Sequence, residues 1–432
     1  MNNERRHIVI VGGGFGGISA AKKLRKADVD LTIIDRANHH LFQPLLYQVA
    51  TAALSPGDIA VPIRAVLGNA PHIRVILDEV RAIDKAGNTL TLSNDETISF
   101  DELILAPGSH YNYFGNEEWE AFAPGLKSIA NALDVRERIL LSLEEAEKLE
   151  DPKLREPYLT YVIIGGGPTG VEMAGAIAEI AKRNIMRDYN TFSKNETRIF
   201  LVEAGPAILN GYPRSLSEKA REMLEDMGVR VLLNTPVTEI GNNRVKFREG
   251  AIDTPNIIWA AGVLADSPLL RSLGVEQDRT GRVRINEDLS IPGHPNIFVI
   301  GDAAYLEQDG QPLPALAPVA LQQGRYLGKR LRINPEARED RPFRYKDKGS
   351  MATIGRAKAI ADIKGFKLSG FIAWLIWSFV HILFLIDFRN RFRVFVEWIW
   401  FYFTLKRDIR LITNRVSADK AESVESTASK IS

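Results

Sequence analysis

A glycine-rich turn that directly follows a short β-branched segment constrains the fold of this chain more than any other feature. Residues 7–11 form a predicted buried strand, and Gly12, Gly14 and Gly17 follow it in GxGxxG spacing before a helical pattern begins. Bare backbone lets a pyrophosphate approach the helix N-terminus, where free N–H groups and the helix dipole favour an anion. The next predicted strand ends at Asp35, about twenty residues on, where a carboxylate can bind a ribose hydroxyl. The pattern predicts a βαβ dinucleotide-binding unit.

The same pattern occurs a second time in the chain. Gly165, Gly167 and Gly170 repeat the spacing after another β-branched strand, and a further predicted strand ends at Glu203. A single GxGxxG is weak evidence, because glycine turns also serve close helix packing. Two copies, each with its strand and acid, favour dinucleotide binding over two coincidental turns. The longer gap before Glu203 indicates an enlarged helix or loop.

Composition excludes several classes of function. The 432 residues are long enough for about three domains, and a formal net charge of +1 gives no reason to expect a nucleic-acid partner. The chain contains no cysteine, so it cannot form a redox-active disulfide or a thiolate metal site. The N-terminus leads directly into the first strand without a signal-peptide pattern, and we therefore expect the catalytic part in the cytoplasm.

The order of the motifs predicts which site holds which cofactor. A strand ending at Gly301-Asp302 can place a carboxylate on a flavin ribityl chain, so the first domain should resume after residue 275. The N-terminal site is then the FAD site, and the inserted unit, closed by a strand that runs towards Gly262, is the nicotinamide site. Glu203 would repel a 2′-phosphate and favour NADH over NADPH. The predicted domains are an FAD-binding domain of residues 1–155 and 275–335 and an NADH-binding domain of residues 156–274.

Three further segments are assigned by their composition. The loop after Asp35, which contains Gln43, is either an ordinary loop or a cap over the flavin, and its His39 and His40 lack the partners of a metal site. Ala106 begins a backbone turn close to the first cofactor. Gln322 and Gln323 lie early in a predicted helix and are either simply solvated or close to the flavin. Residues 128–150 form a predicted amphipathic helix, which we assign to surface connection.

The C-terminal part, residues 336–415, has a different character. Residues 371–386 carry no charge, but as a helix they would rise roughly 24 Å, less than the roughly 30 Å of a bilayer core. A basic and densely aromatic stretch follows, and four of the six tryptophans of the chain fall in this region. We expect residues 366–412 to lie on a lipid bilayer surface, with tryptophan at headgroup depth. The alternative is a helical pair packed on the domains or on a second subunit of a homodimer. Residues 416–432 are predicted to be disordered.

These motifs together resemble type II NADH dehydrogenases, the single-subunit, non-pumping NADH:quinone oxidoreductases bound to one membrane face. The resemblance covers the chain to about residue 412 and includes the loop 42–50, both glycine motifs and the stretches 259–263, 301–302 and 349–355. It implies noncovalent FAD on the first motif with Asp35 and Asp302, and NADH on the second motif with Glu203. Glu172 matches a family carboxylate near the nicotinamide and flavin. The cofactor-binding residues expected in all are Gly12, Gly14, Gly17, Asp35, Gln43, Ala106, Asp302, Gln322, Gly165, Gly167, Gly170, Glu203 and Gly262, with Glu172 and Gln322 catalytic.

The chain departs from the family pattern at two positions. Pro318 stands where family members often carry the first glutamine of an Ala-Gln-x-Ala-x-Gln-Gln motif at the quinone, and Pro107 replaces a threonine beside the flavin. The expected function is hydride transfer from NADH to FAD and electron transfer on to a membrane quinone at the cytoplasmic face of the inner membrane, without proton pumping. Two alternatives use the same motifs: a soluble reductase for a ferredoxin- or rubredoxin-type protein, and a noncatalytic nucleotide-sensing protein.

Overall fold

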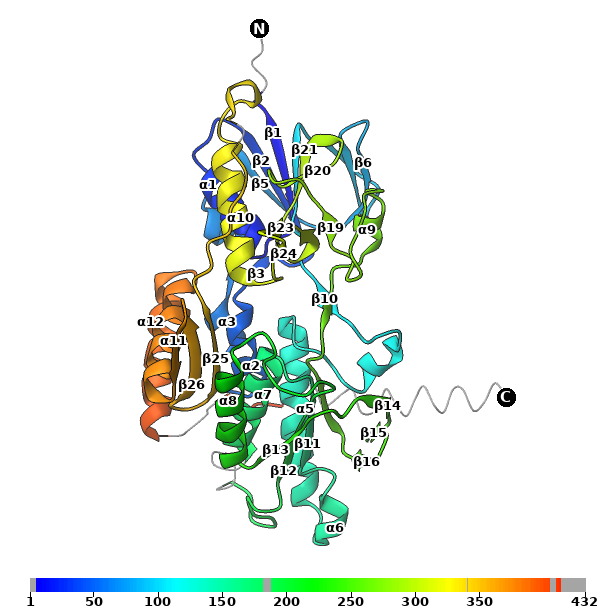
Figure 1. The fold of residues 1–432 in the computed structure, drawn as a ribbon, viewed down its shortest axis with the longest axis vertical. Coiled ribbons are helices and arrows are strands. Elements are labelled where there is room, and N and C mark those ends of the chain that lie inside the picture. The colour runs from blue at the N-terminus through cyan, green and yellow to red at the C-terminus, as the bar shows by residue number, and fades with distance from the viewer. Residues whose placement is uncertain (1–4, 182–187, 340, 405–408, 413–432) are drawn as a thin grey trace, which may run out of the picture.

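The computed structural model describes residues 5–181, 188–339, 341–404 and 409–412. Two open sheets lie one above the other along the long axis, and the C-terminal helices flank them on one side (Figure 1). The predicted disordered tail, residues 416–432, lies outside the described residues. The arrangement confirms the predicted α/β fold with two Rossmann-like units and an appended C-terminal region.

The upper sheet has six strands in the order β20-β21-β9-β1-β2-β5. Its central strands are buried, with Ile8, Val9 and Ile10 at zero exposure, because helices cover one face and a small three-stranded sheet covers the other. Strands from the beginning of the chain therefore share a sheet with strands that follow the inserted unit. The elements are β1 (His7–Val11), α1 (Phe15–Leu24), β2 (Asp30–Asp35), β5 (Ile73–Leu77), β6 (Val80–Asp84), β7 (Thr89–Leu92), β8 (Thr97–Ser99), β9 (Glu102–Leu105), β20 (Ser290–Ile291), β21 (His294–Val299) and α10 (Ala317–Arg330).

The lower sheet has four parallel strands in the order β13-β12-β11-β17. The predicted amphipathic helix within residues 128–150 is present and buries its apolar face. Leucine, isoleucine and alanine side chains at helical spacing, among them Ala132, Ile139 and Leu143, join the largest apolar cluster of the described residues. The elements are α5 (Ile129–Glu147), β11 (Thr160–Ile164), α7 (Pro168–Glu179), β12 (Arg198–Val202), α8 (Arg214–Asp226), β13 (Val229–Leu232), β14 (Val237–Gly241), β15 (Arg244–Phe247), β16 (Gly250–Asp253) and β17 (Asn256–Trp259).

The C-terminal region is a three-stranded antiparallel sheet with two helices (orange in Figure 1). The sheet comprises β25 (Ser350–Gly355), β26 (Lys358–Ile363) and β27 (Phe366–Ser369), and the helices are α11 (Phe371–Phe384) and α12 (Phe388–Thr404). Helix α7 packs against β25 so closely that a side chain at Gly175 would overlap the Ile354 carbonyl. Within the described residues, neither α11 nor α12 nor any other helix has the length and hydropathy needed to span a bilayer.

Short elements connect these layers. Helices α2 and α3 lie between the two large sheets in Figure 1. The remaining elements are β3 (His39–Leu41), η1 (Gln43–Leu45), α2 (Leu46–Ala50), α3 (Pro56–Ile59), β4 (Ala60–Pro62), α4 (Ile63–Leu67), β10 (His110–Tyr111), η2 (Glu117–Ala121), α6 (Pro152–Arg155), β18 (Val263–Leu264), α9 (Pro268–Arg271), β19 (Val283–Arg284), η4 (Gly301–Ala303), β22 (Ala304–Tyr305), β23 (Glu307–Gln308), β24 (Gln311–Pro312) and η5 (Pro335–Ala337).

Candidate functional site

The first glycine turn has the geometry of a dinucleotide-binding loop. Gly12 has a φ of 104°, and a side chain there would overlap the Ala106 carbonyl, so only glycine fits. The Asp35 carboxylate accepts hydrogen bonds from the backbone N–H groups of Gly13 at 2.5 Å and of Ala37 at 2.6 Å. The buried His40 ring contacts the Gly13 carbonyl at 2.9 Å, and burial lowers the pKa of this histidine. His40 therefore supports the turn as a neutral side chain.

The second glycine turn repeats this geometry. Gly165 has a φ of 109°, and a side chain there would meet the backbone of Ala260 at 2.6 Å. Glu203 accepts hydrogen bonds from the backbone N–H groups of Gly166 at 2.6 Å and of Gly205 at 2.7 Å. Gly262 follows the last strand of this sheet with a φ of 83° and lies beside Asn112, whose backbone N–H reaches its carbonyl at 3.4 Å. The sequence motif thus produces two turns with the same carboxylate arrangement.

A polar cluster surrounds the Gly301-Asp302 turn. The Ser109 hydroxyl donates to Asp302 at 2.5 Å, and the Lys127 ammonium lies 3.8 Å from the same carboxylate. Burial lowers the pKa of Lys127, while the charge of Asp302 raises it. Gln43 is exposed and donates to the Lys127 carbonyl at 3.4 Å. Sequence reasoning missed Ser109 and Lys127, because nothing in their local pattern relates them to a residue almost two hundred positions away.

Of the two neighbouring glutamines of α10, it is Gln323 and not the predicted site residue Gln322 that contacts this turn. Gln323, the next residue, is buried and accepts a hydrogen bond from the Gly301 N–H at 2.7 Å. Gln322 lies on a different face of α10, where its amide exchanges two hydrogen bonds of 3.0 Å with the backbone of Lys346. Successive residues of a helix point about 100° apart, so only one of the two glutamines can face the turn.

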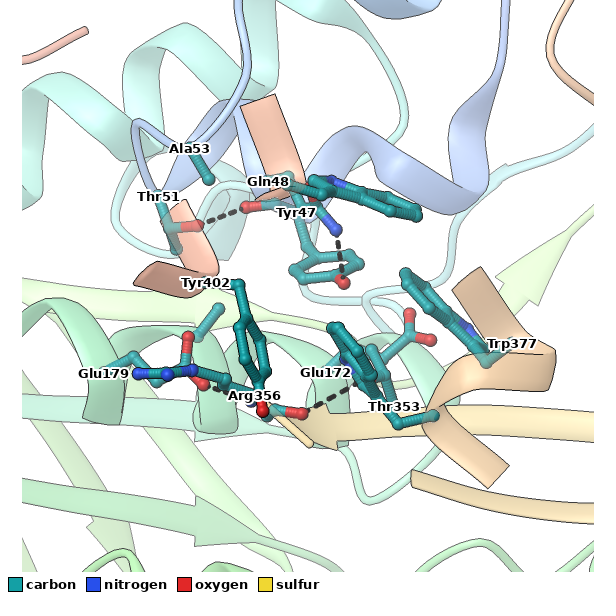
Figure 2. Close-up of a pocket in the computed structure, with 14 residues that line it drawn as sticks. Tyr47, Gln48, Thr51, Ala53, Glu172, Glu179, Thr353, Arg356, Trp377 and Tyr402 are labelled. Carbon is teal, nitrogen blue, oxygen red and sulfur yellow. Dashed lines mark hydrogen bonds between the residues drawn. The ribbon is translucent and has the colours of Figure 1, made fainter. Parts of the chain in front are cut away.

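A cavity opens where the two nucleotide-binding units meet the C-terminal helices (Figure 2). The α2 segment contributes one wall, α7 and β25 a second, and aromatic side chains of α11 and α12 a third. Gln322 does not line this cavity. Its lining residues are Tyr47, Gln48, Thr51, Ala53, Glu172, Ala176, Glu179, Thr353, Gly355, Arg356, Trp374, Trp377, Trp398 and Tyr402.

Glu172 is the acid of this cavity with a strongly shifted pKa. It lies in the second turn of α7, directly after the glycine motif, and Figure 2 shows it facing Tyr47 and Trp377. Burial raises the pKa of the Glu172 carboxyl to about 8, and a hydrogen bond from the Thr353 backbone partly offsets that rise. At neutral pH the carboxyl therefore holds a proton, so it can donate a hydrogen bond or a proton to a bound molecule.

The aromatic side chains of the C-terminal helices are not arranged as predicted. Trp377 is buried, and it stacks on Trp398 with a centroid distance of 5.3 Å and on His381 at 4.2 Å. Burial lowers the pKa of His381 to about 4, so this ring is neutral. Of the four tryptophans expected at headgroup depth, only Trp400 counts among the exposed large side chains, at 52%. The other three tryptophans face the cavity, where they pack against apolar surface and are shielded from water.

The outward faces of the same helices are apolar as well. Large side chains recur every three to four residues along α11 and α12 and form one exposed stripe on each helix. We call the two stripes together the apolar face. Its residues are Phe371, Ile372, Leu375, Phe379, Leu383, Phe384, Phe388, Phe392, Phe395, Val396, Ile399, Trp400 and Phe403.

Fold and site together define an oxidoreductase with two Rossmann-like units and a cavity between these units and the C-terminal helices. Residues 6–324 match the family model of the pyridine nucleotide-disulphide oxidoreductases, and residues 348–407 match the NDH2 C-terminal domain. The absence of cysteine from the chain separates it from the disulphide chemistry that gives the first family its name.

Individual relatives specify the family more closely. The chain is 42% identical over 429 residues to the type II NADH:quinone oxidoreductase Ndh of Mycobacterium tuberculosis, covering 95% of this chain and 91% of that protein. It is 31% identical to the internal alternative NAD(P)H-ubiquinone oxidoreductase A1 of Arabidopsis thaliana mitochondria, covering 95% and 86%. The Plasmodium falciparum NDH2 structure in complex with NADH has the same fold, with a TM-score of 0.85 at 21% identity and coverage of 94% and 99%. The chain belongs to the type II NADH:quinone oxidoreductase family.

Proposed function

We propose how this family member carries electrons from NADH to a quinone, beginning with FAD in the N-terminal site. The site fits the cofactor, because no atom lies within 4 Å of where a side chain at Gly14 would be. Helix α1 has no acidic residue in its first turn that would repel a pyrophosphate. Asp35 would hold the ribose and Asp302, with Ser109 and Lys127, the polar chain of the flavin. Bound FAD supplies a two-electron relay between the two substrates.

NADH is assigned to the inserted site for the same reasons. The space above Gly167 is equally open, and the first turn of α7 carries no acid. Glu203 would accept hydrogen bonds from the adenosine ribose. Residues 1–155 and 275–335 then form the FAD-binding domain and residues 156–274 the NADH-binding domain. This assignment puts Glu172, which follows the glycine motif on α7, at the junction of the NADH site and the cavity.

The quinone is assigned to the cavity, and the observation that carries this assignment is the position of Glu172 opposite the aromatic side chains that α11 and α12 contribute to the wall. A flat apolar headgroup suits a space lined by Trp374, Trp377 and Trp398. The reaction converts NADH, a quinone and one proton into NAD⁺ and the quinol. The protonated Glu172 carboxyl can supply a proton beside the reduced oxygen and recover it from solvent.

The assay that tests this assignment uses the purified flavoprotein, NADH and a water-soluble quinone. Ala53 lies in the cavity wall, and Ala53→Trp should fill the space and lower quinone reduction at least tenfold. Bleaching of the flavin absorbance by NADH without oxygen should continue at the wild-type rate. Quinone reduction that is unchanged in Ala53→Trp would place the quinone elsewhere.

The apolar face is assigned to contact with a lipid surface at the cytoplasmic side of the cell membrane. Its exposed phenylalanines, such as Phe392 at 61% and Phe403 at 79%, are costly in water and stable among acyl chains. Arg389, which is exposed on the same helix α12, suits anionic headgroups. The quinone cavity lies on the inner side of these helices, so a lipophilic quinone would travel a short distance from the bilayer.

Vesicle flotation tests the lipid assignment. Deletion of the C-terminal region would expose core residues such as Trp377, whereas outward substitutions leave the core intact. We expect Phe392→Glu with Phe403→Glu to release the enzyme from vesicles of anionic phospholipid. Leu77→Glu with Leu154→Glu, at exposed positions of β5 and α6, is the matched control and should still float. Release that is accompanied by a change from dimer to monomer would show instead that this face joins two copies of the chain.

A further inference from the structure

A chain of three side chains connects the outer helix α12 with the cavity. The Trp398 indole N–H donates to Gln48 Oε1 at 2.8 Å, and Gln48 Nε2 donates to the Tyr47 hydroxyl oxygen at 2.8 Å. Gln48 is 9% exposed and Tyr47 is 7% exposed. The contact between Trp398 and Gln48 joins residues 350 positions apart, and both residues line the cavity, so it ties α12 to α2 directly at the cavity wall.

The chemistry of the three groups determines which of them donates and which accepts in these two hydrogen bonds. An indole N–H can only donate, so the oxygen of the Gln48 amide must face Trp398 and the NH₂ group must face Tyr47. The hydroxyl oxygen of Tyr47 therefore acts as the acceptor in this contact. Its hydrogen cannot point back at the amide and must be directed elsewhere.

The cavity lies on the other side of that hydroxyl. Figure 2 shows the Tyr47 ring reaching into the space in which Glu172 and Trp377 lie, with the amide of Gln48 behind it. We propose that Gln48, held by Trp398, is a positioning residue that directs the Tyr47 O–H at the carbonyl oxygen of the quinone. The proposal rests on the assignment of the quinone to this cavity. Tyr47 donates a hydrogen bond and keeps its proton.

The benefit of this arrangement lies in the reduction step. Negative charge grows on the quinone oxygen as electrons arrive, and a donor already aimed at that oxygen binds the reduced form more strongly than the quinone. Tyr47→Phe should lower kcat for quinone about tenfold, which corresponds to the loss of one well-placed hydrogen bond.

Two substitutions of Gln48 separate positioning from packing. The carboxylate in Gln48→Glu keeps the size of the side chain and both contacts, but it accepts from Trp398 and also from Tyr47, so the hydroxyl turns away from the quinone. Gln48→Leu removes both contacts, so the amide no longer fixes the direction of the Tyr47 hydroxyl. Positioning predicts that kcat falls about tenfold in Gln48→Glu and less than fivefold in Gln48→Leu. A merely structural role predicts the opposite order, because the leucine leaves the Trp398 N–H unpaired.

A third substitution tests the other end of the chain. Trp398→Phe removes the donor that fixes the amide, and we expect a severalfold loss of kcat for quinone. Trp119→Phe, on η2 outside the cavity, is the matched control and should leave kcat unchanged. Flavin bleaching by NADH should stay within twofold of wild type in all variants, because hydride transfer to the flavin precedes the quinone.

The outcomes separate this inference from the function on which it rests. Additive losses from Gln48→Glu and Tyr47→Phe in the double variant, or a larger loss in Gln48→Leu than in Gln48→Glu, would overturn the positioning role. If Ala53→Trp removes quinone reduction while the Gln48 variants behave as wild type, the cavity assignment holds and the positioning role does not. If Ala53→Trp also has no effect, the cavity assignment itself is wrong.

Discussion

The two glycine turns of this protein are almost the same structure built twice. The positive φ angles of Gly12 and Gly165 differ by a few degrees, at 104° and 109°. In both turns a side chain at the third glycine would overlap the carbonyl of the first, and a carboxylate, Asp35 or Glu203, binds two backbone N–H groups. The two turns therefore share the backbone geometry and the carboxylate position that are typical of a dinucleotide-binding loop.

The two turns differ in the element against which the following helix, α1 or α7, packs. Helix α1 packs on α10, where Gly324 lies against the Gly16 carbonyl, so its far side is closed by the apolar core of the upper sheet. Helix α7 packs on β25 and lines the cavity with Glu172, whereas the equivalent position of α1 is the buried Ser19. On the proposed assignment, the glycine motif provides the dinucleotide site, and the packing partner of the helix determines whether a second substrate can approach.

The largest effect expected from this comparison is the loss of folding in Gly12→Ala. The new side chain would overlap the Ala106 carbonyl at a backbone angle that alanine disfavours, and we expect a loss of at least about 3 kcal/mol in unfolding free energy. Gly14→Ala is the control, because its φ of −72° is allowed and no atom lies within 4 Å. It should fold normally in denaturant titrations yet purify without flavin colour, since its methyl group occupies the place of the pyrophosphate.

A smaller effect is expected on stability at Glu172, where it should depend on pH, in contrast to the equivalent position Ser19. The folded-state pKa of Glu172 is about 8 against an ordinary value of 4.5, so above pH 4.5 the folded chain binds a proton that the unfolded chain has lost. This contribution to stability is fully present below pH 4.5, falls as the pH rises and is lost by about pH 8. Glu172→Gln should therefore gain about 3 kcal/mol over wild type at pH 7 and nothing at pH 4. Thermal unfolding of the holoenzyme at several pH values measures this, and Ser19→Ala should show a difference independent of pH.

The same substitution has a kinetic consequence. Quinone reduction by wild type should decline as the pH rises through about 8, where the Glu172 carboxyl loses its proton. Glu172→Gln should be slower at neutral pH and should lack this decline. A wild-type profile that stays flat to pH 9 would remove Glu172 from the proton-donor role.

The comparison also shows how far a sequence alone can predict such a protein. Both sheets, both glycine turns and their carboxylates follow from patterns within about forty residues, where strand, turn and acid succeed each other. The sequence did not show whether Gln322 or Gln323 faces the Gly301-Asp302 turn. Neighbouring residues of a helix point about 100° apart, and composition does not reveal how the helix is rotated about its axis. The cavity was not predicted, because its wall unites Tyr47, Glu172 and Trp398 from three distant segments. The inward orientation of the tryptophans depends on that wall, and for this reason the interface-type composition was misleading.

The smallest effect concerns the two carboxylates themselves. Glu203→Gln should raise kcat/KM for NADPH severalfold and lower it for NADH, because an amide no longer repels the 2′-phosphate and binds the ribose more weakly. The ratio of the two kcat/KM values should change by about tenfold, which is about 1.4 kcal/mol. Asp35→Asn, the same change in the other turn, should weaken flavin retention and leave that ratio as in wild type. An altered NADPH preference in Asp35→Asn would mean that the two sites are assigned in the wrong order, since only the carboxylate of the nicotinamide site can distinguish the two coenzymes.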